Sequence, residues 1–351
     1  MRRWPGTPEL VMAVQIDVLD PRQHSEPPYW EALRIRAGLR ADWSYELLRI
    51  AAWCSPVPLL LTVLRDSAEA VGLICASWTG VPAHHGKYVA PRGRPWLGAL
   101  YVESPGTSAV PGWWFAERLS LTERTELCWD YLHGMRRELG PRCRGVVWRH
   151  AAAADLPVLR GKRRGLLRST SSIAVLPLAW PTPEQWLASL SRSRRNDLRR
   201  QRRHVDADPD LSVCVGPGGD LDPGQVARLL RANEAKYADR HAGLPITTSM
   251  VTALLGRDDV VTVRYIDHAG RLLGFGAVLD HPTAPVSRHW AGVAVEHGGR
   301  RHLYFDMYLR VIEWAMQTGR KEINFGRAKL DIKRDLGCEL QSRYSVAVPC
   351  W

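Results

Sequence analysis

Residues that could hold a phosphate or an activated carbonyl group gather near the end of the chain, between Trp290 and Gly337. An apolar run stops there at a charged, glycine-bearing bend, residues 296–301, and apolar residues then recur at three- and four-residue steps. This spacing predicts a helix, which a short strand (322–325) and a polar loop (326–333) follow. Backbone N–H groups at a helix start, facing a basic loop, suit an anionic or carbonyl-bearing group.

The bend and the loop supply the candidate binding residues. Gly298 and Gly299 let the backbone approach a phosphate, and Arg300 and Arg301 add charge-assisted hydrogen bonds. Lys333 is a catalytic candidate, because a lysine beside a bound substrate that carries an activated carbonyl group can polarise that carbonyl or hold an oxyanion. The other candidates flank these features; they are Val293, Val295, Tyr304, Phe325, Gly326, Arg327 and Lys329. An exposed turn and a solvated basic loop would show the same residues without any function.

Charge points to anionic partners. The chain has 351 residues and a formal net charge of +12 at pH 7, which favours RNA, coenzyme A or other phosphate-bearing ligands but also fits a soluble basic surface. A helix predicted from Pro183 onwards runs into seven arginines between Arg192 and Arg203. That run could bind RNA phosphates or form a solvated face, and it has no neighbouring aromatic residues for base stacking.

The sequence argues against some classes of protein. Its seven cysteines are scattered and show no CxxC spacing, so neither a zinc ribbon nor a disulfide framework is indicated, and we expect no metal. The longest apolar runs are strand-sized, and the N-terminus lacks the pattern of a signal peptide. We therefore expect a cytoplasmic protein without stable membrane insertion.

The two halves of the chain echo each other in their predicted elements. Each has a leading helix, a hairpin (59–78 and 260–279), a third strand, a further helix and a further strand. A duplicated α+β (α/β) unit of roughly 150 residues explains this repetition. We therefore predict domains at residues 1–170 and 171–351.

The second half resembles the GNAT superfamily in its tandem form, the FemABX-like and BioF2-like acyltransferases. Three segments carry the resemblance: the arginine-rich helix end at 191–199, Leu273-Gly274-Phe275-Gly276-Ala277, and the helix–strand–loop order of 308–337 with Lys333 three residues before Leu336-Gly337. The resemblance implies two tandem GNAT-like domains, each a mixed, mostly antiparallel sheet flanked by helices. The first domain would be degenerate and hold the acceptor, and the second would hold the donor.

Membership of this family implies transfer of an acyl group onto an amine. The donor is acyl-coenzyme A in some members and aminoacyl-tRNA in others, and a lysine at the position of Lys333 helps to hold the donor carbonyl in FemX-type members. The coenzyme A pyrophosphate loop of simple GNAT enzymes, Gln/Arg-x-x-Gly-x-Gly/Ala, is absent here, and His297-Gly298-Gly299-Arg300-Arg301 stands in its place. The long coiled-coil arm of some FemABX proteins is also missing.

The sequence thus predicts an N-acyltransferase with a small-molecule or peptide amine acceptor in the groove between domains. Acyl-coenzyme A is slightly favoured as donor over aminoacyl-tRNA, with peptidoglycan or a peptide natural product as possible products of the latter. The amine must lose a proton, and Glu234 and Tyr237, on one helix face near the predicted groove, are the candidates that could take it. A non-catalytic, basic RNA-binding protein on a GNAT-like scaffold is the further alternative.

Overall fold

The computed structural model describes residues 14–81, 97–161, 165–236 and 244–350. The first half contains β1 (Val14–Leu19), α1 (Trp30–Arg36), α2 (Tyr45–Cys54), β2 (Leu59–Asp66), β3 (Glu69–Val81), β4 (Leu97–Val102), β5 (Trp113–Phe115), α3 (Leu121–Leu139), β6 (Cys143–Ala151), α4 (Leu156–Arg160) and β7 (Leu166–Pro177). Within the described residues, three short 3-10 turns lie at Ala41–Trp43, Ala153–Asp155 and Val295–His297.

From β8 onwards the second half repeats the order of elements of the first half, without a described counterpart of β5, and two helices precede this repeat. It contains α5 (Pro183–Ser189), α6 (Arg192–Asp206), β8 (Leu211–Gly216), α7 (Pro223–Ala235), α8 (Thr248–Leu255), β9 (Val260–Asp267), β10 (Leu272–Leu279), β11 (Val286–Gly292), α9 (Leu303–Gln317), β12 (Glu322–Gly326), α10 (Leu330–Asp335) and β13 (Glu339–Pro349).

In the described residues the strands form one continuous sheet. The order is β1-β2-β3-β4-β6-β13-β7-β12-β11-β10-β9-β8, with β5 added on β3. All neighbours run antiparallel except two pairs, β4 with β6 and β11 with β12, which are parallel. The predicted fold class, a mixed, mostly antiparallel sheet flanked by helices, is confirmed.

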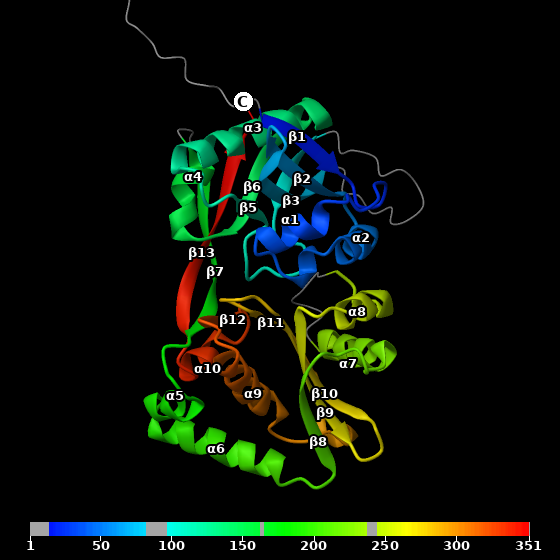
Figure 1. Ribbon diagram of the computed structural model, residues 1–351, viewed down its shortest axis with the longest axis vertical. Coiled ribbons are helices and arrows are strands. Elements are labelled where there is room, and N and C mark those ends of the chain that lie inside the picture. The colour runs from blue at the N-terminus through cyan, green and yellow to red at the C-terminus, as the bar shows by residue number, and fades with distance from the viewer. Residues whose placement is uncertain (1–13, 82–96, 162–164, 237–243, 351) are drawn as a thin grey trace, which may run out of the picture.

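Two long strands join the halves, as Figure 1 shows for β7 and β13. Residues 166–169 of β7 pair with residues 344–347 of β13, whose outer edge pairs with β6. Further along, residues 174–177 of β7 pair with β12. Val346 and Val348 of β13 are buried in the core of the first half. The predicted domain boundary at residue 170 falls inside β7, and the last strand completes the sheet of the first half.

Helices cover both faces of each half, because alternate strand residues point to opposite faces. In the first half, α3 and α4 pack on one face and α1 and α2 on the other. In the second half, α5, α6 and α9 cover one face, and α7 and α8 cover the other. The α7–α8 layer also meets α2, so one apolar cluster crosses between the halves.

The structure corrects two predicted elements. The loop predicted at 326–333 ends in a helix, α10, because Leu330, Lys333 and Leu336 turn one face to the core and the lysine stem takes the place of an apolar residue. The helix predicted to continue into the arginine run breaks at Leu190, where Ser191 starts a new helix by accepting a hydrogen bond of 3.2 Å from the Arg194 N–H.

Candidate active site

The two parallel strands of the second half separate soon after they meet. β11 and β12 share a single residue pair, Val286 with Asn324, although β11 runs on to Gly292. The equivalent strands of the first half, β4 and β6, share four pairs and stay together. An opening in the sheet therefore exists in the second half, beside the predicted donor position, and its counterpart in the first half is closed.

The helices that follow these openings also differ at their starts. In α3 the N-terminal amides are satisfied by a capping box, in which Ser120 and Glu123 exchange hydrogen bonds of 3.2 and 2.7 Å. In α9 the N-cap residue is His302, which has a left-handed backbone (φ 71°) and gives no side-chain cap. The positive end of the α9 dipole therefore lies open to a ligand in a way that the start of α3 does not.

The bend before α9 is tightly folded on itself. A Cβ on Gly299 would meet the Val293 carbonyl oxygen at 1.9 Å, so only glycine fits there, and Gly298 has φ 83°. The N–H groups of His297, Gly298 and Gly299 donate to carbonyl oxygens of the preceding turn at 2.9, 3.1 and 3.0 Å. Three amides that a phosphate would need are thus used within the bend.

The predicted binding residues on and beside the bend differ in their contacts and in their exposure to solvent. The Arg300 guanidinium lies 2.7 Å from the Asp208 carboxylate. Val295 and Arg301 are exposed, whereas Val293 packs on the core beneath α9.

Lys333 points into the protein, and its ammonium donates a hydrogen bond to the Phe325 carbonyl oxygen. The residue is 4% exposed, and burial lowers the pKa of Lys333 to about 8. The Phe325 ring lies 4.8 Å from that of Tyr308, whose hydroxyl is 2.8 Å from the Tyr304 hydroxyl. Predicted residues Lys333, Phe325 and Tyr304 therefore join the first turns of α9, with Tyr308 as the link that sequence reasoning missed.

The loop between β12 and α10 faces the first half of the molecule. An N–H of Arg327 lies 3.2 Å from the ring of His150, a buried residue with a left-handed backbone (φ 61°). Burial and then Arg327 lower the pKa of His150 to about 4, so the imidazole is neutral at pH 7. Gly326 has φ 73°, and exposed Lys329 starts α10 with φ 53°.

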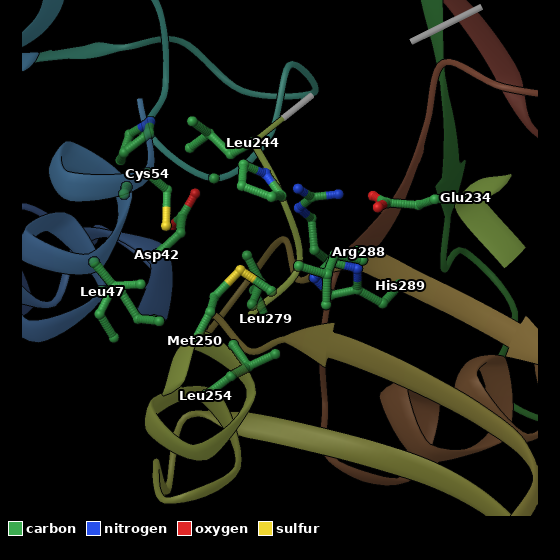
Figure 2. A pocket seen from close by; sticks show the side chains of 16 residues that line it. Asp42, Leu47, Cys54, Glu234, Leu244, Met250, Leu254, Leu279, Arg288 and His289 are labelled. Carbon is green, nitrogen blue, oxygen red and sulfur yellow. The ribbon is translucent and has the colours of Figure 1, made fainter. Parts of the chain in front are cut away.

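A cavity of ≈ 80 Å³ lies between the halves, on the face of the sheet opposite α9 (Figure 2). Its polar residues are Asp42, Glu234, Arg288 and His289. His289 and Trp290 are neighbours on β11 with opposite directions: His289 lines the cavity, and Trp290 packs against Tyr304 with ring centroids 5.7 Å apart. β11, the strand that borders the opening in the sheet, therefore carries side chains that face the cavity and side chains that face the start of α9.

Burial shifts the charges that line this cavity. It raises the pKa of Asp42, an effect that Arg40 and the Ser104 hydroxyl partly offset. Desolvation at the cavity also lowers the pKa of Arg288, although part of its side chain is exposed to solvent, and the carboxylates of Asp42 and Glu234 act against this shift. The pKa of His289 lies well below its ordinary value because of burial and then Arg288, so His289 is neutral.

Contacts between the halves hold the cavity walls together. Nε of Arg40 donates to the Ala284 carbonyl oxygen at 3.2 Å, and the amide of Asn324 donates to the Ala109 carbonyl oxygen at 2.9 Å. Glu234 reaches the cavity from α7, and Figure 2 shows its carboxylate turned toward Arg288. Tyr237, the other predicted proton acceptor, lies outside the described residues.

The arginine run divides into two sets on α6. Arg202 is half-buried and forms ion pairs with Asp206, Asp306 and Glu313, at 2.9 to 3.5 Å, that tie α6 to α9. The exposed set faces solvent; it comprises Arg192, Arg199, Arg200 and Arg203. Part of the run is therefore structural, and part offers positive charge to a partner.

Sequence reasoning missed Asp42 and Arg288. Asp42 and Arg288 meet only through tertiary packing, so no local pattern links them. The one available signal was Arg288-His289, two polar residues in succession within an apolar strand, which is typical of a bulge. Within the described ranges, no group of three or more His, Cys, Asp or Glu side chains could hold a metal ion. The helices described are all too short or too polar to cross a membrane.

Residues 192–334 match the acetyltransferase (GNAT) domain family. No curated protein matches the sequence significantly.

Solved structures share the fold at low sequence identity. The C-terminal domain of a putative lysylphosphatidylglycerol synthetase from Agrobacterium fabrum has a TM-score of 0.60 at 10% identity, covering 90% of this chain and 89% of that one. The L-PGS structure from Bacillus licheniformis has a TM-score of 0.59 at 11% identity, with 92% and 91% covered. FemX has a TM-score of 0.52 at 10% identity, with 82% and 87% covered. Residues 192–334 therefore match a GNAT domain, and the whole chain has the fold shared by FemX and the lysylphosphatidylglycerol synthetase domain.

Proposed function

We propose that the protein transfers an acyl group from an activated donor onto an amine bound between its halves. One observation carries this proposal: β11 and β12 diverge between the open start of α9 on one face and the cavity on the other. A donor carbonyl placed in the opening would meet the α9 dipole and the Lys333 region. An amine placed in the cavity would approach the same carbonyl from the opposite face.

The reaction needs no covalent enzyme intermediate. The bound ammonium first gives one proton to a carboxylate that lines the cavity, for which Asp42 and Glu234 are the candidates. The neutral nitrogen then attacks the carbonyl carbon and forms a carbon–nitrogen bond. The single bond between that carbon and the ester oxygen breaks, and the second proton passes from the nitrogen to the departing oxygen. An ammonium has three donors, so Lys333 can stabilise the oxyanion while it keeps its bond to Phe325.

The internal hydrogen bonds of the bend favour aminoacyl-tRNA over acyl-coenzyme A as donor. Three consecutive amides at the pyrophosphate position already donate to carbonyl oxygens. The exposed arginines of α6 supply positive charge suited to an RNA backbone. The name of one structural neighbour, lysylphosphatidylglycerol synthetase, describes attachment of an amino acid to a lipid, which is consistent with aminoacyl transfer.

Acyl-coenzyme A is the second candidate donor, because the start of α9 has no side-chain cap and could bind a phosphate group. A non-catalytic RNA-binding protein is the third candidate, and only the exposed arginines favour it.

The test supplies the purified protein with mixed aminoacyl-tRNAs or an acyl-coenzyme A panel, together with amino acids and short peptides as acceptors. Mass spectrometry detects new amides. We expect products from charged tRNA, at least a hundredfold fewer with Lys333→Met, and no change with the control Lys321→Met, an exposed lysine. Products from the thioesters alone would favour the second donor. Salt-sensitive RNA binding without amide formation from either donor would refute transfer.

A further inference from the structure

The cavity between the halves contains a carboxylate with one oxygen left unsatisfied. Asp42 is 6% exposed, and its Oδ2 accepts a hydrogen bond of 3.2 Å from the Ser104 hydroxyl. Its Oδ1 is buried and has no hydrogen-bond partner among the described residues. Because an unpaired buried oxygen is costly, this atom marks a place for a donor group from outside the protein.

A β-bulge turns a guanidinium into the same cavity. Ser287 pairs with Val278 and His289 pairs with Ala277, so Arg288 has no partner across the β10–β11 ladder. Bulges of this kind redirect a side chain. Figure 2 shows Arg288 between Asp42 and Glu234, and both carboxylates interact electrostatically with its guanidinium.

The remaining walls are apolar. Leu47 and Ile50 come from α2, Met250 and Leu254 from α8, and Leu279 from β10. A ligand that satisfies the whole site must therefore carry a cation, an anion and a short apolar group on one small framework.

The volume limits the size of that ligand. One water needs about 10–15 Å³ of cavity, so a cavity of ≈ 80 Å³ accepts roughly five to eight non-hydrogen atoms. Alanine and valine fall in this range, whereas lysine, phenylalanine and tryptophan exceed it.

We propose that the cavity binds a small apolar α-amino acid, with its ammonium group on Asp42, its carboxylate on Arg288 and its side chain among Leu47, Met250 and Leu254. This proposal rests on the proposed function in one respect: the bound amino group would be the acceptor of the acyl group. The recognition itself is independent of any donor.

Binding is therefore measured without a donor, by isothermal titration calorimetry. The probes are L-valine, L-alanine, isobutylamine (valine without its carboxylate), isovalerate (valine without its ammonium) and L-lysine. We expect L-valine or L-alanine to bind at least tenfold more tightly than the other three. Asp42→Asn and Arg288→Gln should each weaken that binding at least tenfold, while the exposed controls Asp258→Asn and Arg228→Gln should not change it.

Selectivity of the wild-type protein decides the matter even if a variant fails to fold. Equal affinity for isobutylamine and valine would show that Arg288 does not bind the carboxylate of the ligand, and it would overturn the proposal. Tighter binding of lysine, or no binding of valine and alanine, would overturn it as well. Selective binding of valine without any amide formation would support this site while refuting the transferase function, so the two proposals fail separately.

Discussion

The side-chain amide of Asn233 donates a hydrogen bond of 3.1 Å to the carbonyl oxygen of Trp290. Trp290 lies on β11 beyond its single pair with β12, where the strand has lost its neighbour on that side. A backbone carbonyl in such a place needs another partner, and α7 supplies it. The same contact fixes the turn of α7 that carries Glu234 to the cavity.

Asn233→Ala should reduce both stability and transfer. Loss of one hydrogen bond should lower the free energy of unfolding by about 1 kcal/mol. Because the opening would also lose a support, we expect kcat/KM to fall more than the folded fraction does. Urea denaturation and kinetics check this, with exposed Asn196→Ala as the control. Unchanged kinetics in a destabilised variant would limit Asn233 to a structural role.

Ser120→Ala tests whether only the second half holds the donor. Removal of the α3 cap should cost about 1 kcal/mol of stability, as capping residues do. Transfer at a temperature where the variant remains folded should equal that of the wild type, because the first-half opening is closed. A tenfold loss of activity in folded protein would mean that α3 takes part in donor binding.

Lys333 should make stability depend on alkaline pH. The unfolded lysine keeps its proton up to its ordinary pKa of 10.5, whereas the folded one loses it above about 8. Between these values the unfolded chain binds more protons, so stability should rise with pH, by up to about 3 kcal/mol. Lys333→Met should lack this rise, and denaturant titrations of both proteins from pH 7.5 to pH 10 measure the difference. Parallel curves would contradict the buried position of the ammonium.

His150 should make the stability of the fold depend on pH in the acidic range. Its folded pKa is about 4, against an ordinary 6.5, so the unfolded chain binds more protons between these values. Stability should therefore fall as the pH drops from about 6.5 to about 4, by up to about 3 kcal/mol. His150→Asn removes the titrating group, and asparagine tolerates the left-handed backbone. Thermal melts over this pH range should show that the variant loses less stability on acidification than the wild type does.

The exposed arginines of α6 should govern any RNA affinity. Replacing Arg199, Arg200 and Arg203 by glutamine should weaken tRNA binding and reduce the slope of log K against log salt by about 2 for single-stranded contacts. A matched set on the first half, Arg137, Arg142 and Arg144, should have little effect. Arg202→Gln should instead lower the melting temperature, because Arg202 pairs with Asp306 and Glu313. Equal RNA loss in both triple variants would indicate a diffuse charge effect.

The sequence determined most of the elements because their apolar residues follow the helix or strand period. The hairpins at 59–78 and 260–279, the helix after Gly299 and the strand before Gly326 all lie where that spacing predicts. It also identified the bend, since a glycine pair followed by arginines is a local signal. α10 was missed because Lys333 fills a core position that the pattern counts as polar.

Only the tertiary structure decided which residues meet. The separation of β11 from β12, the bulge at Arg288 and the pairing of β13 with β6 are relations between distant segments, and local periodicity does not encode them. Asp42 and Arg288 come from opposite halves and share one cavity because α2 packs on α8. The chain's own spacing could therefore suggest a donor site near Lys333, but the cavity that we propose for the acceptor exists only once both halves have packed together.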